Sequence, residues 1–306
     1  MGSSGIEFLR NHLNVWWLRP ESALYQAIAS TVISRYKIKS PSIDLGCGNG
    51  IFSFITAGGK FSLDYDWFRN VDFSKKDIYD AKRKEEISQY IEREPKYKFD
   101  WGADIKANLL HQAEGLNFYK NLKLHDITYS LPFEEESFST VFSNILYWLR
   151  DPGAVLKEIY RILVPEGRAL LCMPNQNFYK YCTSYRWKTQ SGLKKSLMRA
   201  INRDRYKCIA HTFYRSQFVT IAKKAGFSKI ESVPYLSPHT LKFWDVGLRP
   251  LSRPLIKMAN ELGSSKRRKL KREWIDTCFE YLNLLYKMEF ESKGKKGFYL
   301  FVFEKV

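Results

Sequence analysis

Three glycines on alternate positions follow a short apolar run that contains an acid. The whole segment is Ser42-Ile43-Asp44-Leu45-Gly46-Cys47-Gly48-Asn49-Gly50. A strand that turns sharply into a helix needs glycine where φ is positive or where a side chain would clash. Glycine also lets the backbone approach a ligand, and the following helix presents N–H groups to polar or anionic atoms. The segment therefore predicts a loop that holds a nucleotide or a nucleoside cofactor.

Polar side chains follow three further predicted strands, at the point where each strand ends. They are Asp104, Asp126 and Asn144. In an open parallel sheet, ligands bind at the carboxyl ends of the strands, where the strand order switches. One carboxylate there can accept both ribose hydroxyls, and another can accept from an adenine amino group with the backbone N–H of Ile127 beside it. This order of residues behind the glycine run favours a nucleoside site.

The elements that must position these residues alternate between strands and helices. Strands are predicted over 42–45, 99–103, 122–125, 140–143, 168–173, 229–233 and 297–305. Helices are predicted within 6–36 and over 51–57, 74–94, 106–114, 152–163 and 217–225. In the first of these regions Trp16 and Trp17 form an aromatic cluster that we expect to dock in the core. The alternation predicts an α/β fold with a doubly wound, mostly parallel, seven-stranded sheet and helical insertions.

The motifs resemble those of the class I S-adenosylmethionine-dependent methyltransferases, in particular the small-molecule branch with domains like methyltransferase type 11. Residues 44–50 resemble the glycine signature of that family, and Gly102-Ala103-Asp104-Ile105 resembles its second-strand acid. His125-Asp126-Ile127 with Leu131-Pro132-Phe133-Glu134 resembles its adenine-binding segment. The likeness runs over roughly residues 41–173 and includes Ser143-Asn144, Glu158-Ile159-Tyr160-Arg161 and Pro165-Glu166-Gly167. It implies a Rossmann-like fold with S-adenosyl-L-methionine as the cofactor.

The resemblance also implies roles for individual residues. Asp104 would bind the ribose, Asp126 and Ile127 the adenine, and the glycine loop with Asp44 the methionine moiety, which Asn144 would adjoin. The predicted cofactor-binding set is Asp44, Gly46, Cys47, Gly48, Gly50, Asp104, Ile105, Asp126, Ile127 and Asn144. A nicotinamide dehydrogenase is the rival interpretation of the loop. Its fingerprint needs a glycine at the position that Ile51 occupies.

Two features depart from the family pattern. Asp104 follows Gly50 by 54 residues, against roughly 20 in a compact βαβ unit, which indicates an insertion over 59–98. Many small-molecule members carry Glu-His where this chain has Tyr147-Trp148, so no general-base histidine can be assigned there. His211 is a weak catalytic candidate, and a structural histidine is the stronger interpretation. Methyl transfer needs mainly a positioned nucleophile, so the catalytic residue stays unassigned.

The net charge of +18 is concentrated in two segments. Residues 176–215 carry a net charge of +9 and residues 242–273 carry +7. The predicted organisation is an N-terminal helical extension (1–40) and a methyltransferase domain (41–306) with insertions at about 59–98, 174–212 and 235–296. We expect the last two to form a basic cap over the acceptor, because local positive potential suits an anionic ligand. Solvated faces that keep the protein soluble are the alternative.

Three kinds of partner fit this charge. An acidic small molecule or a lipid-linked, phosphate-bearing sugar is the preferred acceptor, in peripheral contact with an anionic membrane surface. RNA is an alternative because basic and aromatic residues suit phosphates and stacked bases, although no recognisable RNA-binding module is present. A non-catalytic scaffold is the third reading. The intact glycines and acids argue against that one.

Cysteine use and hydropathy bear on the compartment. The five cysteines are scattered and lack a CxxC pair, which argues against a disulfide framework and a zinc site. No basic-then-apolar leader is seen, nor a run of the roughly 18 apolar residues that a membrane span needs. We therefore expect a cytoplasmic protein without a metal, at the inner face of the membrane if the acceptor is lipid-linked.

Overall fold

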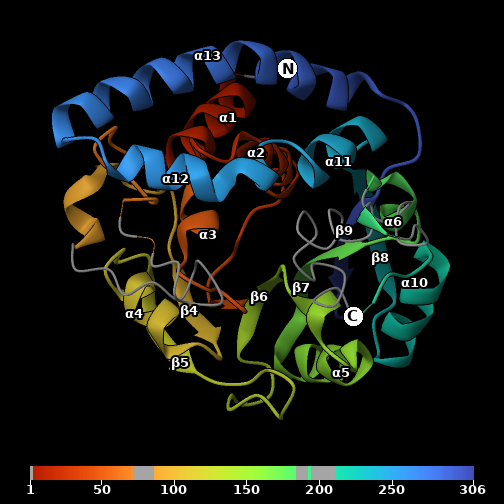
Figure 1. The fold of residues 1–306 in the computed structure, drawn as a ribbon. Helices are drawn as coiled ribbons and strands as arrows, with labels where there is room; N and C mark the ends of the chain where they lie inside the picture. Colours follow the sequence, from red (N-terminus) through yellow and green to blue (C-terminus); the bar gives the residue numbers. More distant parts are fainter. Residues whose placement is uncertain (1–2, 70, 72–85, 184–191, 194–210) are drawn as a thin grey trace.

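A computed structural model describes residues 3–69, 71, 86–183, 192–193 and 211–306 (Figure 1). The strands of its main sheet are β1 (Ser42–Leu45), β4 (Phe99–Asp104), β5 (Tyr119–Leu124), β6 (Phe138–Ser143), β7 (Leu163–Pro174), β8 (Lys229–Tyr235) and β9 (Phe298–Glu304). Their order is β5-β4-β1-β6-β7-β9-β8. β9 runs antiparallel to both neighbours and the remaining pairs are parallel. The predicted seven-stranded, mostly parallel sheet is confirmed.

Helices cover both faces of this sheet. They are α1 (Ser3–Val15), α2 (Pro20–Ile33), α3 (Ile51–Thr56), α4 (Ala107–Glu114), α5 (Pro152–Ile162), α6 (Asn177–Tyr181), α10 (Arg215–Lys224), α11 (Pro238–Asp245), α12 (Ser252–Asn260) and α13 (Ser264–Glu291). Short 3-10 turns are η2 (Ile87–Tyr90), η3 (Leu146–Trp148) and η4 (Arg249–Leu251). In Figure 1, α1, α2 and α3 lie on one side of the strands and α5 and α10 on the other, with α13 outermost above α1 and α2.

Capping residues explain where the functional helices begin. Asp151 caps α5 by accepting hydrogen bonds from the N–H groups of Gly153 and Ala154 at 2.9 and 3.1 Å, and Pro152 takes the first helical position. Both choices suit a helix N-terminus, where donors lack partners and φ is near the value of proline. Proline also takes the first position of α2, which begins directly after Arg19.

The aromatic cluster between α1 and α2 docks in the core, as predicted. Trp16 and Trp17 are 4% and 0% exposed. The indole N–H of Trp17 donates to Asp66 Oδ1 at 3.0 Å, and the rings of Trp16 and Trp67 lie 4.8 Å apart. The cluster therefore joins the N-terminal helices to the insertion that follows α3.

That insertion contains a small sheet where a helix was predicted. β2 (Lys60–Phe61) and β3 (Ile91–Arg93) pair antiparallel, and η2 leads into β3. The predicted helix over 74–94 is wrong at 91–93, because pairing with β2 makes these residues a strand and overrides the local helix pattern. Residues 87–90 form the 3-10 turn η2, which buries Ile87. Residues 74–85 of that prediction lie outside the described residues.

The long helix α13 packs through both apolar and basic side chains. An apolar stripe that includes Ile275 and Leu282 is buried, and the helix contacts α1 and α2. Arg267 Nε lies 2.6 Å from Asp66 Oδ2, and Lys271 Nζ donates to the carbonyl oxygen of Leu63 at 3.0 Å. Part of the basic run at the start of α13 is therefore used to fasten the helix to the insertion.

The second and third insertions meet beyond the carboxyl end of β7. The rings of Phe178 in α6 and Trp244 in α11 lie 5.7 Å apart, and Trp244 stacks on Tyr25 of α2 at 5.3 Å. Most of the first basic segment, 184–191 and 194–210, lies outside the described residues, so its cap role stays a prediction. Within the described ranges, no helix combines the length and apolarity needed to cross a bilayer.

We expect Asp66→Ala to lower the free energy of unfolding by about 3–5 kcal/mol, because the buried Arg267 guanidinium loses its counter-ion. Urea denaturation measures this change. Asp64→Ala is the matched control, since the Asp64–Arg268 pair is about half exposed on both sides and should cost less than about 1 kcal/mol. Equal losses in the two variants would contradict the proposed anchoring of α13.

Candidate functional site

The glycine loop after β1 is tied to the neighbouring strand β4. The N–H groups of Gly46 and Cys47 donate to the carbonyl oxygen of Ala103 at 2.7 and 3.0 Å. Gly46 and Gly50 have φ values of +79° and +75°. A Cβ at Gly50 would lie 2.8 Å from the Tyr119 ring. Positive φ and close packing together require glycine at these positions.

Asp104, at the end of β4, closes the loop from the other side. Its Oδ2 accepts a hydrogen bond from the N–H of Gly48 at 2.9 Å, and its Oδ1 accepts from the N–H of Lys106 at 2.8 Å. Each carboxylate oxygen can accept a second hydrogen bond. The adjacent Ile105 side chain is 62% exposed, an unusual setting for a large apolar group beside a strand end.

Asp44 lies beneath the loop and is almost fully buried. Its Oδ2 accepts from the hydroxyl groups of Ser53 at 2.6 Å and Tyr119 at 2.8 Å. Burial raises the pKa of Asp44 to about 6, the two hydroxyl donors oppose this rise, and the nearby Asp104 charge adds to it. Burial likewise raises the pKa of the Cys47 thiol, which favours its neutral form.

The remaining predicted residues lie at the ends of β5 and β6. Asp126 Oδ1 accepts from the N–H and the hydroxyl of Thr128 at 2.9 and 2.8 Å, and Ile127 is 4% exposed. Asn144 Oδ1 is buried and accepts no hydrogen bond from the described part of the chain. An unpaired buried acceptor is costly. The amide oxygen is therefore a candidate contact for a ligand.

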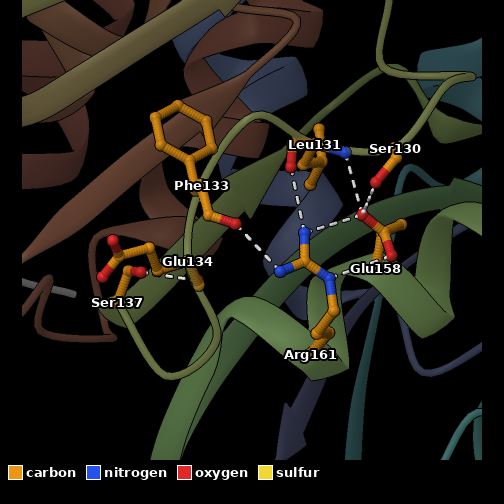
Figure 2. Close-up of polar contacts among 7 residues, drawn as sticks. All are labelled: Ser130, Leu131, Phe133, Glu134, Ser137, Glu158 and Arg161. Atoms are coloured by element: carbon orange, nitrogen blue, oxygen red, sulfur yellow. Dashed lines mark hydrogen bonds and ion pairs between the residues drawn. The ribbon is translucent and has the colours of Figure 1, made fainter.

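An ion pair in α5 holds the segment that follows Asp126 (Figure 2). Arg161 donates to the carbonyl oxygens of Phe133 and Leu131 at 2.8 and 2.9 Å. Glu158 Oε2 accepts from the N–H of Leu131 at 2.8 Å and from the Ser130 hydroxyl at 3.0 Å. The hydrogen bond from Arg161 lowers the pKa of Glu158 to about 2. These contacts position the loop between β5 and β6.

His211 lies beside the loop that follows β6. Its N–H donates to the carbonyl oxygen of Tyr147 at 3.1 Å, and its Nε2 lies 2.8 Å from the carbonyl oxygen of Arg150. A carbonyl oxygen only accepts, so Nε2 carries the proton and Nδ1 of a neutral ring is the acceptor. The ring also stacks on Phe213 at 5.6 Å. These contacts hold the ring in place at the rim of the site.

Sequence reasoning missed the groups that line the site from below and beside it. Tyr119 bonds Asp44 across 75 residues, and no local pattern relates the two positions. The Phe298 ring at the start of β9 lies 5.9 Å from Tyr147 and 5.4 Å from Phe178. A sequence signal for Tyr119 was the aromatic pair Phe118-Tyr119, directly before the predicted strand over 122–125.

We expect Asp44→Asn to change how stability depends on pH. The folded-state pKa of about 6 lies above the ordinary value of 3.8, so the native state binds the proton more tightly than the unfolded chain. The parent therefore loses stability as pH rises from about 4 to about 6, by up to about 3 kcal/mol from this group, and Asp44→Asn removes that loss. Urea denaturation across this pH range measures the difference.

Asp100 provides a control, because its pKa is shifted in the opposite direction from that of Asp44. Hydrogen bonds from Lys120, Ser40 and Ser42 outweigh desolvation, and the pKa of Asp100 is lowered. Asp100→Asn should therefore destabilise the protein at neutral pH, and its deficit should shrink as pH falls below the ordinary value of 3.8. A pH-independent difference between Asp44→Asn and the parent would refute the burial effect on Asp44.

Comparison with known proteins places this geometry in context. Residues 96–171 match the family model described as a methyltransferase domain. No curated protein matches the chain.

Similar solved structures include an S-adenosylmethionine-dependent methyltransferase from Thermotoga maritima, with 14% identity, 95% of this chain and 93% of that chain covered, and a TM-score of 0.49. Another is a phosphoethanolamine N-methyltransferase of Haemonchus contortus, in complex with phosphomonomethylethanolamine and S-adenosylhomocysteine. It shares 17% sequence identity with this chain, the match covers 97% of this chain and 60% of that chain, and the TM-score is 0.45. A third is an arsenic(III) S-adenosylmethionine methyltransferase of Chlamydomonas reinhardtii. It shares 20% sequence identity with this chain, the match covers 63% of this chain and 54% of that chain, and the TM-score is 0.37.

The matched segment spans β4 to β7 and includes Asp104, Asp126, Asn144 and the Glu158–Arg161 pair. The sheet has the strand order of a doubly wound fold with one antiparallel strand, and the motif residues gather at its carboxyl edge. Residues 96–171 thus resemble a methyltransferase domain, and they lie within a doubly wound, mostly parallel sheet.

Proposed function

We propose that the carboxyl edge of β1, β4, β5 and β6 holds S-adenosyl-L-methionine. The observation that carries the proposal is the 2.9 Å hydrogen bond between Gly48 and Asp104. It brings the glycine loop and the second-strand acid together across 56 residues, at the switch in strand order between β1 and β6. Ligand sites of open α/β sheets occur at such switch points.

The residues present fit the chemical groups of the cofactor. Asp104 retains acceptor capacity for the ribose hydroxyls, and the exposed Ile105 offers apolar surface to an adenine ring. Asp126 and the backbone of Ile127 supply polar groups for the adenine edge. The end of β4 would therefore bind the ribose, and the segment after β5 would bind the adenine edge.

The methionine moiety has its own polar surroundings. The glycines leave the backbone free of Cβ atoms beneath it, Asp44 supplies a carboxylate for its amino group, and the unpaired Asn144 Oδ1 is a further acceptor. When bound, the cofactor supplies an electrophilic methyl group on a sulfonium. The residues of this chain bind and orient it, exclude water, and position the acceptor.

His211 is a candidate for removing a proton from the acceptor. His211 holds its Nε2 proton against Arg150, which leaves Nδ1 to accept a proton. Methyl transfer to a basic nitrogen would not need this step, whereas a hydroxyl acceptor gains from a base. Orientation of the acceptor is the main contribution to rate in either case.

The proposed acceptor is an acidic small molecule or a lipid-linked, phosphate-bearing molecule. The support is the location of the charge: the segment 176–215, of net charge +9, begins at the carboxyl end of β7 and returns at His211 beside Tyr147. α6 and α11, from the two basic insertions, pack together at the same edge. This placement favours an anionic acceptor that approaches from the cap side.

We expect Asp104→Ala to weaken binding of S-adenosylhomocysteine by at least about tenfold, because two charge-assisted acceptor positions are lost. Isothermal titration calorimetry measures the affinity. Glu114→Ala is the matched control, since Glu114 is an exposed acid on the helix that follows β4, and its affinity should equal that of the parent. Unchanged binding in Asp104→Ala would rule out the assigned ribose contact.

Transfer of tritiated methyl groups from labelled cofactor into fractionated cell extract tests the acceptor. We expect label in the lipid fraction or in anionic, water-soluble metabolites, and no transfer with Asp104→Ala. Label that is found only in RNA would support the nucleic-acid alternative and refute the proposed acceptor class. Retention of label by a neutral metabolite would equally contradict the charge argument.

A further inference from the structure

A polar groove lies where α13 begins, away from the strand ends that carry the cofactor motifs. It has a volume of about 330 Å³ and is lined by Leu63, Asp64, Asp66, Arg69, Tyr90, Ser264, Ser265, Arg267, Arg268 and Lys271. None of these residues belongs to the carboxyl ends of β1, β4, β5 or β6. In Figure 1 the start of α13 overhangs the insertion that follows α3.

Positive charge prevails in the groove. Four cationic side chains face two carboxylates, which leaves an excess of two positive charges. Asp66 is paired with Arg267 at 2.6 Å and Asp64 with Arg268 at 2.9 Å. Arg69 forms no ion pair among the described contacts of the groove and donates to the Ser264 hydroxyl at 2.6 Å.

One donor in this groove is buried and unpaired. Arg267 is 4% exposed; its Nε bonds Asp66 and its Nη1 bonds Asn260 Oδ1 at 2.7 Å. Its Nη2 has no hydrogen-bond partner in the described part of the chain. A buried guanidinium N–H without an acceptor is costly, so an anion in the groove would relieve that cost.

The N-terminus of α13 opens onto the same groove. Gly263 takes the cap position, no side chain caps the helix, and its first turn contains no acid. A Cβ at Gly263 would meet no atom within 4 Å, so this end of the helix is open. The free N–H groups and the dipole of a 28-residue helix favour a negative group at that position.

We propose that this groove binds the phosphate group of an anionic ligand, held by Arg69, Arg268, the buried Arg267 and the first N–H groups of α13. The site is separate from the cofactor site and does not depend on the identity of the methyl acceptor. Arginine suits this task because its planar donors match the oxygen atoms of phosphate. A lipid headgroup and a free phosphate compound present the same chemistry here.

Isothermal titration of the full chain with inorganic pyrophosphate tests the proposal without reference to methyl transfer. We expect saturable binding that weakens with added salt. The double variant Arg69→Ala/Arg268→Ala should bind at least about tenfold more weakly. Lys287→Ala/Lys293→Ala removes two exposed charges at the other end of α13 and should leave the affinity within about twofold of the parent.

Ser265→Asp separates binding from folding. A carboxylate in the first turn of α13 stabilises the helix but repels an anion from the same donors. The melting temperature should therefore hold or rise while pyrophosphate binding is lost. Binding that is unchanged in Ser265→Asp, or equally weakened in the two double variants, would overturn the proposal.

Vesicles of phosphatidylcholine with and without phosphatidic acid identify the source of the phosphate. Retention that requires phosphatidic acid and is lost in Arg69→Ala/Arg268→Ala assigns the groove to a lipid headgroup. Pyrophosphate binding without vesicle retention assigns it to a free phosphate compound. Absence of both pyrophosphate binding and vesicle retention refutes the site.

Discussion

The chemistry of this protein depends on one constraint, the parallel alignment of β1, β4, β5 and β6. Parallel strands end at a common edge, so residues from four distant segments meet there. Backbone hydrogen bonds from Gly46 and Cys47 to Ala103, and from Gly48 to Asp104, then fasten the glycine loop to β4. Three glycines of the loop have positive φ, and the hydrogen bonds to β4 hold the loop in that conformation.

Burial divides the acids of the site into two kinds. Asp44 lies under the loop, where burial favours its protonated form and two hydroxyl groups hold its orientation. Asp104 and Asp126 lie at the rim, with backbone N–H groups on their oxygens. Depth in the fold therefore gives the same residue type two different settings. The rim acids accept from backbone N–H groups, and the buried acid accepts from hydroxyl groups.

Part of the excess positive charge at the start of α13 has an architectural use. In α13 the side chains at 267 and 271 face inward, one helical turn apart, and those at 266, 268, 269 and 272 face outward. The inward pair fastens the helix to the insertion over 59–98. The Glu158–Arg161 pair likewise holds the loop after β5, through hydrogen bonds to the backbone of Leu131. Net charge alone could not distinguish inward-facing, anchoring cations from exposed ones, because only the helix phase and the partner segment separate them.

The sequence by itself determined the strand and helix order, the glycine loop, and the acids at the strand ends, because each depends on local patterns of period two or 3.6 and on turn chemistry. It also indicated the buried role of Trp16 and Trp17. Only the tertiary structure decided the β2–β3 pairing, the Tyr119–Asp44 contact and the groove at α13. These depend on contacts between residues far apart in the chain, where burial and pairing partners outweigh local propensity.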